Sequence, residues 1–258
     1  MDERILLAGN REVWRVGDAV ERATKPWSKS VMRFLRHLER DGLPVEHIIS
    51  VDENLEISRF VEGEIVHPKK WSDDALFEIG RLVADLHNSS RNFVPCSDDI
   101  WQRWGLRKIG IGERIVCHGD IAPWNIITEG VKPKTLLDWE YAGLLDPFVE
   151  LARVCWLFPQ LVDDDLQVLH NLPSAKKRAE QVRIIADGYG LSAAKRSKLI
   201  EQIIEVVICE TAHEAIAPDH QSDPLTFGSE GNLWGFAWRT RSLYWIWRNK
   251  EILNDALK

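Results

Sequence analysis

The chain has 258 residues, of which 45% are hydrophobic and 28% charged, a balance typical of a globular protein with a core of its own. Its formal net charge of -7 argues against nucleic acid as the main partner, because duplex binding needs clustered positive charge. No run of about 18 uncharged apolar residues occurs, so we expect no membrane-spanning helix.

The cysteines and the first residues indicate a reducing compartment. None of the four cysteines lies in a C-x-x-C pair, which argues against a zinc site or a redox dithiol. The chain starts MDERILLAG, without the basic and apolar regions of a signal peptide. We therefore expect a cytoplasmic protein with free thiols, and no pattern indicates its oligomeric state.

The first sixty residues predict short strands and one helix. Three β-like runs, ILLAG, EVWRVG and DAVERAT, are separated by Gly-Asn at residues 9–10 and Gly-Asp at 17–18, which are typical of hairpin turns. Apolar residues at helical spacing then predict a helix over 28–41. HIISVD and LEISRF are two further strands. This order favours an antiparallel sheet with one helix laid on it.

The rest of the chain is predicted to be mainly helical. A crossing segment over residues 61–71 leads to a helix over 73–88 and to a loop-rich stretch over 89–112. Between Arg114 and Trp139 the pattern changes to strand, loop, strand, turn, strand. Further helices are predicted over about 147–157, 175–189, 195–216 and 232–256.

These elements predict an α+β fold with two lobes. Residues 1–61 would form a small antiparallel β-rich lobe that carries one helix. Residues 62–258 would form a larger, mainly helical lobe. We expect the chemistry near the junction and in the strand-rich stretch of the second lobe.

One stretch carries residues suited to phosphoryl transfer: IVCHGDIAPWNIIT, followed by KTLLDWE. That reaction needs a carboxylate at the acceptor hydroxyl and hard oxygen ligands for Mg²⁺. Asp120 follows an apolar strand, and Asn125 ends the same loop. A hairpin turning at residues 129–130 would bring Asp138 back beside Asn125. We therefore predict Asp120 as the catalytic base, and Asn125 and Asp138 as magnesium ligands.

This arrangement resembles the catalytic loop and metal-binding motif of the protein-kinase-like fold, with Gly119 where protein kinases have Arg and Trp139 where they have Phe. His-Gly-Asp with Asp-Trp-Glu is similar to the aminoglycoside phosphotransferase and choline kinase superfamily. The stretches LAGN, FVEGE and LLDPFVELA extend the resemblance over most of the chain, toward the bacterial phosphotransferase enzyme family, some of whose members are trifolitoxin-immunity-like. The resemblance implies ATP- and Mg²⁺-dependent transfer of the γ-phosphate to a small-molecule hydroxyl.

The resemblance also implies supporting roles around this loop. Glu150 stands where the family usually carries Asp, and would brace the catalytic loop through hydrogen bonds. For His118 we favour a ring tied to the backbone over direct contact, and for His87 a packing role. Glu140 is equally compatible with a contact to a second metal and with a solvated acid.

The resemblance assigns the nucleotide site to the first lobe. Arg22 would take the place of the kinase lysine that holds the phosphates, with Glu39 on the following helix as its partner. A surface ion pair within that helix is the alternative for Glu39. Adenine would dock near Phe60, Val61 and Glu62. Two features depart from the family. The glycine-rich loop is shortened, and Arg22 carries a planar, forked guanidinium group where the family has the compact point charge of a lysine.

Three functions stay open. The favoured one is a kinase with an aminoglycoside-like acceptor. A kinase of a metabolite of the choline, sugar or amino alcohol type has the same chemistry. A binding or immunity protein with weak or no catalysis is favoured by Arg22 and the short glycine loop, and opposed by Asp120, Asn125 and Asp138.

The predicted C-terminal lobe contains acids and tryptophans that are candidates for contact with the acceptor. A polycationic acceptor needs an acidic cleft, although solvated surface acids are the simpler interpretation here. For the tryptophans of the last helix, at positions 234, 238 and 245, we favour core packing over a substrate cage. The candidate acids are Asp163, Asp164, Asp165, Glu201, Glu205, Glu210, Glu214, Asp219 and Asp223.

Overall fold

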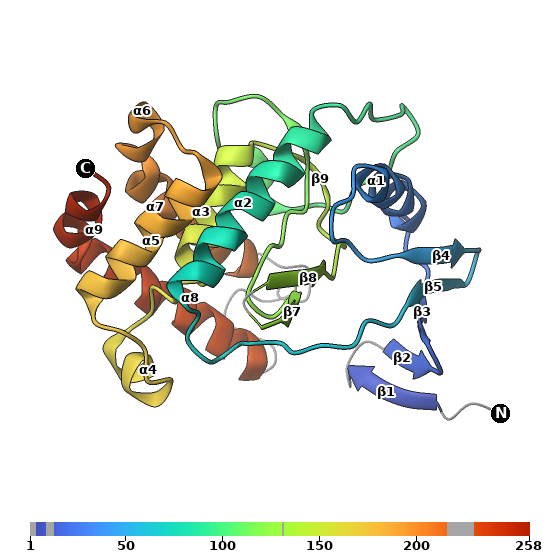
Figure 1. Cartoon of the computed structure of the whole chain (residues 1–258), viewed down its shortest axis with the longest axis horizontal. Coiled ribbons are helices and arrows are strands. Elements are labelled where there is room, and N and C mark those ends of the chain that lie inside the picture. Colours follow the sequence, from blue (N-terminus) through green and yellow to red (C-terminus); the bar gives the residue numbers. More distant parts are fainter. Residues whose placement is uncertain (1–3, 9–12, 131, 216–229) are drawn as a thin grey trace.

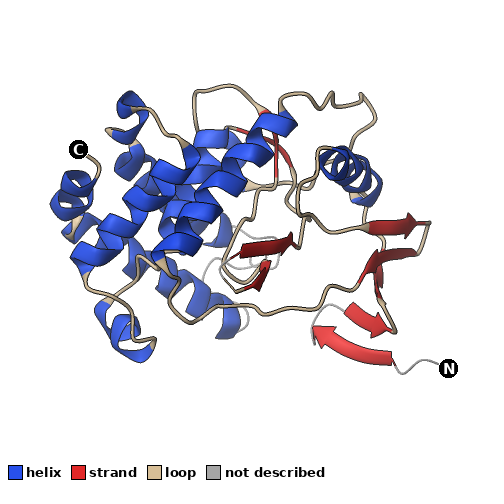
Figure 2. Ribbon diagram, viewed as in Figure 1, coloured by secondary structure: helices blue, strands red, loops and turns tan. Residues whose placement is uncertain are grey.

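The computed structural model describes residues 4–8, 13–130, 132–215 and 230–258. A β-sheet with one helix occupies one end of the molecule, and most other helices gather at the opposite end (Figure 1). Colouring by secondary structure makes the same division plain (Figure 2). The α+β organisation expected from the sequence is therefore confirmed.

The N-terminal sheet is antiparallel throughout, with the strand order β1-β2-β3-β5-β4. The turn between β2 and β3 contains Gly17, whose φ of 59° lies in the left-handed region that favours glycine. The turn expected at residues 9–10 lies outside the described residues. The strands are β1 (Arg4–Ala8), β2 (Val13–Val16), β3 (Ala19–Ala23), β4 (Ile48–Val51) and β5 (Leu55–Arg59).

Helix α1 (Ser28–Arg40) packs its apolar side into the core. Phe34, Leu35 and Leu38 are fully buried, as their helical spacing predicts. The Phe34 ring lies edge-on to Trp139, with 5.9 Å between the ring centroids. The helix of the small sheet therefore touches the segment that directly follows Asp138.

Two small antiparallel sheets lie between the N-terminal sheet and the helices, β6 with β9 and β7 with β8 (Figure 1). The hairpin of β7 and β8 was expected. Strand β9 was not, because three residues are too few to show an alternating pattern. The strands are β6 (Ile115–Cys117), β7 (Ile126–Glu129), β8 (Lys132–Leu136) and β9 (Gly143–Leu145).

The helical part follows the prediction with four differences. Short helix α4 and the 3₁₀ turn η1 were not predicted, the helix predicted over 195–216 is divided into α6 and α7, and the last predicted helix is divided at Asn249. No helix in the described part of the chain is long and apolar enough to cross a membrane. The elements are α2 (Asp73–Ser90), η1 (Gly105–Lys108), α3 (Pro147–Leu157), α4 (Asp164–Leu169), α5 (Ala175–Tyr189), α6 (Ala193–Arg196), α7 (Leu199–Ala215), α8 (Glu230–Arg248) and α9 (Lys250–Ala256).

Helices α2 and α5 cross at two glycines. A Cβ atom on Gly80 would lie 2.3 Å from the carbonyl oxygen of Ile185, and one on Gly188 would lie 2.2 Å from that of Phe77. Both obstacles are backbone atoms, which cannot swing aside as a side chain can. The two backbones can approach this closely only because both residues lack a side chain.

We predict that Gly80→Ala destabilises the protein by about 1–3 kcal/mol, the usual cost of overpacking. The direction of the change in stability is diagnostic, because helix propensity alone predicts that alanine stabilises the helix by about 1 kcal/mol relative to glycine. Urea denaturation measures the change. The matched control is Gly235→Ala in α8, where the nearest atom is the flexible end of Arg239 at 3.0 Å. Equal or greater stability of Gly80→Ala would contradict the close crossing.

Candidate active site

The catalytic loop begins where β6 ends, and His118 anchors it. This side chain is buried; its Nε2 donates to the carbonyl oxygen of Leu137 at 3.0 Å, and its Nδ1 accepts from the Asp120 N–H at 3.2 Å. Burial lowers the pKa of His118, which favours this neutral tautomer. The backbone-tied role expected for His118 is therefore confirmed.

Gly119 lets the chain turn sharply before Asp120. Its φ is 83°, and a Cβ atom there would lie 2.2 Å from the carbonyl oxygen of Tyr141. Its N–H donates to Oε1 of Glu150 at 2.5 Å. The bracing role expected for Glu150 is therefore confirmed, since this carboxylate on α3 holds the loop at its tightest point.

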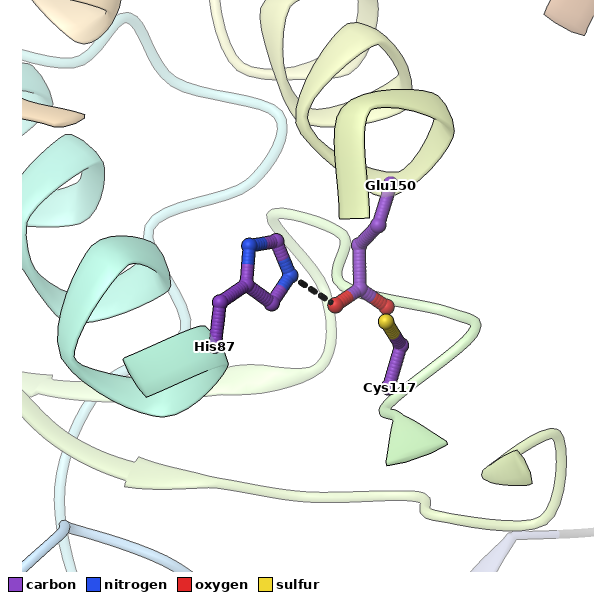
Figure 3. Close-up of side chains that lie close together, drawn as sticks. All are labelled: His87, Cys117 and Glu150. Atoms are coloured by element: carbon purple, nitrogen blue, oxygen red, sulfur yellow. Dashed lines mark hydrogen bonds and ion pairs between the residues drawn. The ribbon is translucent and has the colours of Figure 1, made fainter. Parts of the chain in front are cut away.

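Glu150 belongs to a buried group that the sequence did not reveal (Figure 3). Its Oε2 lies 2.9 Å from Nε2 of His87 on α2, and His87 Nδ1 lies 2.9 Å from the hydroxyl of Tyr189 on α5. Burial would raise the pKa of Glu150, but hydrogen bonding to His87 and the nearby imidazoles lower it. Three helices are thus linked to the catalytic loop through one carboxylate.

The same group has the composition of a metal site, because the Sγ of Cys117 lies within 4.8 Å of the His87 and Glu150 ligand atoms. Metal binding would require a thiolate, whereas burial raises the pKa of Cys117 well above its usual range. Both oxygens of Glu150 and both ring nitrogens of His87 already have hydrogen-bond partners. We therefore interpret the group as a structural brace.

The side chain of Asp120 is held from two sides. Its Oδ2 accepts a hydrogen bond from Nδ2 of Asn125 at 2.9 Å, and its Oδ1 lies 2.5 Å from Nη2 of Arg153 on α3. Arg153 is itself buried and donates to the carbonyl oxygen of Ile121 and to Glu210 on α7. The Asp120 side chain nevertheless remains 15% exposed, so it is accessible from the loop surface.

Sequence reasoning missed Arg153. The signal available was the arginine in VELARVCWL, a helix whose other charged residue is Glu150, because a buried charge must find partners. Glu210 is its second partner and also lies 3.5 Å from Nε of Arg239 on α8. A row of alternating charges therefore runs from Asp120 through Arg153, Glu210 and Arg239.

The hairpin brings Asn125 and the Asp138 segment together as expected. The Leu137 N–H donates to the Asn125 carbonyl oxygen at 2.9 Å. Asp138 has a φ of 62°, a conformation that is unusual for a residue with a side chain and that clusters at functional sites. Because Nδ2 of Asn125 is committed to Asp120, its Oδ1 is left as an acceptor. Amide and carboxylate oxygens of this kind suit Mg²⁺.

The expected pair of Arg22 and Glu39 does not form. Arg22 lies directly opposite Glu56 in the register of β3 and β5, pairs with it, and also lies 3.2 Å from Glu46. Glu39 instead lies 2.5 Å from Nδ1 of His47. Glu39 was misassigned because strand register gives Arg22 a partner on the next strand, and helix spacing could not show this.

Arg22 is still under the electrostatic influence of one predicted metal ligand, Asp138. Burial would lower its pKa, but the charges of Glu46 and Glu56 raise it, and Asp138 adds to this effect. The influence of Asp138 places the guanidinium within electrostatic reach of the segment predicted to hold Mg²⁺.

Part of the backbone in the segment predicted to bind adenine already makes hydrogen bonds within the protein. The Phe60 N–H donates to the Asp18 carbonyl oxygen at 2.8 Å, and the Glu62 carbonyl oxygen accepts from Nζ of Lys134 at 2.8 Å. The backbone of Val61 makes no backbone hydrogen bond with the described residues. Val61 is therefore the position of the three best able to offer its backbone to a base.

Comparisons with known proteins agree with this geometry. The profile of the phosphotransferase enzyme family matches residues 98–196, which contain the whole catalytic loop and the hairpin behind it. The trifolitoxin immunity protein of Rhizobium leguminosarum bv. trifolii is 37% identical over 266 aligned residues, covering 99% of this chain and 99% of that protein.

This chain belongs to the phosphotransferase enzyme family.

Solved structures show the fold of this chain. An amicoumacin kinase in complex with AMP-PNP, Ca²⁺ and Ami matches with a TM-score of 0.70 at 13% identity, covering 93% of this chain and 88% of that one. A microcompartment-associated aminopropanol kinase matches with a TM-score of 0.64 at 14% identity, covering 100% and 94%. The protein-kinase-like, two-lobed arrangement is therefore confirmed, while the lobe boundary at residues 61 and 62 stays a prediction.

We predict that Glu150→Gln lowers stability by about 3 kcal/mol at neutral pH, the order expected when one partner of a buried pair is removed. The pKa of Glu150 is lowered from 4.5 on folding, so its charge stabilises the fold above about pH 4.5. That contribution is lost as the pH falls through the folded-state pKa. Urea denaturation at several pH values measures the difference from wild type, with the exposed Glu129→Gln as control. A difference that grows on acidification would contradict this sign.

The corrected pairing of Arg22 gives a second prediction, about nucleotide affinity. Glu56→Gln should weaken MgATP binding about fivefold, because Arg22 loses one of the two carboxylates that hold its guanidinium. Glu39→Gln should leave the affinity unchanged, because Glu39 pairs with His47. Isothermal titration calorimetry with a non-hydrolysable ATP analogue makes the comparison. A larger loss for Glu39→Gln would restore the pairing expected from the sequence.

Proposed function

We propose that this phosphotransferase uses ATP and Mg²⁺ to transfer the γ-phosphate to a hydroxyl group of a small molecule. The observation that carries the proposal is the convergence of Asp120, Asn125 and the Asp138 segment on one loop. Asp120 would orient or accept the proton of the acceptor hydroxyl. Asn125 and Asp138 would hold Mg²⁺, which would neutralise charge on the phosphates.

Arg22 would approach the phosphates from the N-terminal sheet. Its guanidinium is held by Glu46 and Glu56 and is under the influence of Asp138. The geometry differs from a lysine because the planar group can donate two parallel hydrogen bonds to phosphate oxygens. Phe60, Val61 and Glu62 remain the segment proposed for adenine, with the Val61 backbone as its most available part.

The acceptor expected from the sequence is aminoglycoside-like, which calls for unpaired acids. Among the described residues each candidate acid has a partner. Asp163 and Asp165 pair with Arg241, and Asp164 pairs with Arg248. Asp219 and Asp223 lie outside the described residues. The other pairs are Glu201 with Lys250, Glu205 with Gln202, Glu210 with Arg153, and Glu214 with Arg239.

A second candidate is an immunity protein of the kind named for the 37% identical relative. Both oxygens of Asp120 are engaged, one by Asn125 and the other by Arg153, which favours a binding role with weak or no catalysis. The two candidates coincide if a toxin is the molecule that becomes phosphorylated. They separate if immunity requires binding alone.

We predict that Asp120→Asn lowers the rate of phosphoryl transfer by about 10²–10⁴-fold, because the proton acceptor is removed, and leaves MgATP binding unchanged, because Asp120 is not a predicted ligand of the nucleotide or of the metal. ATP consumption with Mg²⁺ is measured against a panel of aminoglycosides, amino alcohols and sugars. The matched control is Asp98→Asn, an exposed loop acid. Turnover that survives in Asp120→Asn would contradict Asp120 as the base. MgATP binding without turnover on any acceptor would favour the immunity candidate, and failure to bind MgATP would overturn the kinase proposal.

A further inference from the structure

A column of three tryptophan rings connects helices α3 and α8. The buried Trp156 of α3 stacks on Trp238 of α8, with 5.1 Å between ring centroids and 24° between planes. Trp234, one turn before Trp238, continues the stack at 6.0 Å and 4°. We call Trp156, Trp238 and Trp234 the tryptophan column. The core packing expected for these tryptophans holds for Trp245, which is 1% exposed, but not for Trp234, which is 65% exposed.

The inner end of the column lies on α3, the helix that carries the arginine in contact with Asp120. Trp156 lies one helical turn after Arg153, whose guanidinium contacts Asp120. From the other side, Trp124 lies four residues after Asp120 on the catalytic loop, and its ring centroid is 6.5 Å from that of Trp238. Two independent connections therefore join the column to Asp120, on the side where α7 and α8 and not the N-terminal sheet supply the neighbours.

The acids beside the column are already neutralised. Glu210 lies between Arg153 and Arg239, and Glu214 lies 3.6 Å from Nη1 of Arg239. The Arg239 guanidinium itself lies over the Trp238 ring at 5.5 Å. The position at which a cationic ligand would bind this ring is therefore occupied by a side chain of the protein.

The polar neighbour of Trp124 is uncharged as well. The His67 ring lies edge-on to Trp124, with 5.2 Å between centroids. Burial and the nearby His170 lower the pKa of His67, so it is neutral at physiological pH. The environment of the column thus favours a ligand without positive charge.

The outer end of the column is open to a flat ligand. Trp234 and Trp124 are 65% and 36% exposed, which are large fractions for aromatic rings of this size. A hollow of about 70 Å³ adjoins Trp234 and Trp238, with Leu166, Ala237 and the ion-paired Asp163 and Arg241 in its wall. Aromatic faces stack favourably on other planar rings.

We propose that the acceptor carries an uncharged planar aromatic or heteroaromatic ring that stacks on the exposed ring of Trp234, at the outer end of the column. The inference rests on the proposed function and names the class of its acceptor. It distinguishes this chain from an enzyme for a polyamine, whose cleft would need unpaired carboxylates.

Ligand-detected nuclear magnetic resonance titration, without nucleotide, tests the proposal. The probe is 2-(indol-3-yl)ethanol, and its comparisons are the saturated 2-cyclohexylethanol and the polycation spermidine. Trp234→Ala should weaken binding of the indole probe about five- to tenfold, and Trp234→Phe should restore most of it. The matched control is Trp247→Ala, since Trp247 is also 65% exposed on α8 but pairs with Tyr244 away from the column.

Equal effects of Trp234→Ala and Trp247→Ala would overturn the proposal, as would equal binding of the saturated or cationic compound. Circular dichroism confirms that each variant is folded. The Asp120→Asn variant separates this inference from the proposed function. It should keep its affinity for the indole probe, since Asp120 does not contact the ring. Retained ring binding with no transfer activity in the wild type would leave the column as a binding site and overturn only the catalytic proposal.

Discussion

The buried carboxylate of Glu150 is the interaction on which the active-site geometry depends. It accepts a hydrogen bond from the Gly119 N–H and contacts His87, which in turn contacts Tyr189. An ionised group in the interior persists only if its partners offset the cost of removing it from water. Those partners come from the catalytic loop and from separate helices. The loop therefore keeps its shape only when α2, α3 and α5 are correctly packed, and the packing of these helices in turn depends on the shape of the loop.

The charges around Asp120 extend this principle outward. Arg153 is enclosed by protein, so its two carboxylate partners, Asp120 and Glu210, stabilise it as much as it stabilises them. Arg239 continues the series to α8. The proposed acceptor site and the proposed base are therefore parts of one electrostatic network, and a change of charge at α8 is felt at the catalytic loop without any movement of the backbone.

Much of this could be predicted from the sequence because the signals were local. Helix α1 and the hairpin behind Asn125 have clear apolar periodicity or turn residues, and the His118-Gly119-Asp120 motif lies within a few positions. The misassigned and missed features depend on tertiary structure. Glu39 lost Arg22 to Glu56 through strand register, and Arg153 joined Asp120 and Glu210 across 90 residues of chain by fold alone. The short elements α4 and β9 lack enough residues to show a period.

The glycine crossing of α2 and α5 has a consequence for the chemistry. Gly188 directly precedes Tyr189, and Gly80 lies two turns before His87 on the same pair of helices. The separation of the two helix backbones therefore sets the distance from the Tyr189 hydroxyl to the His87 ring, and through Glu150 the position of the Gly119 N–H. The contact between Gly80 and Gly188 therefore helps to set the geometry of an active site that neither glycine touches.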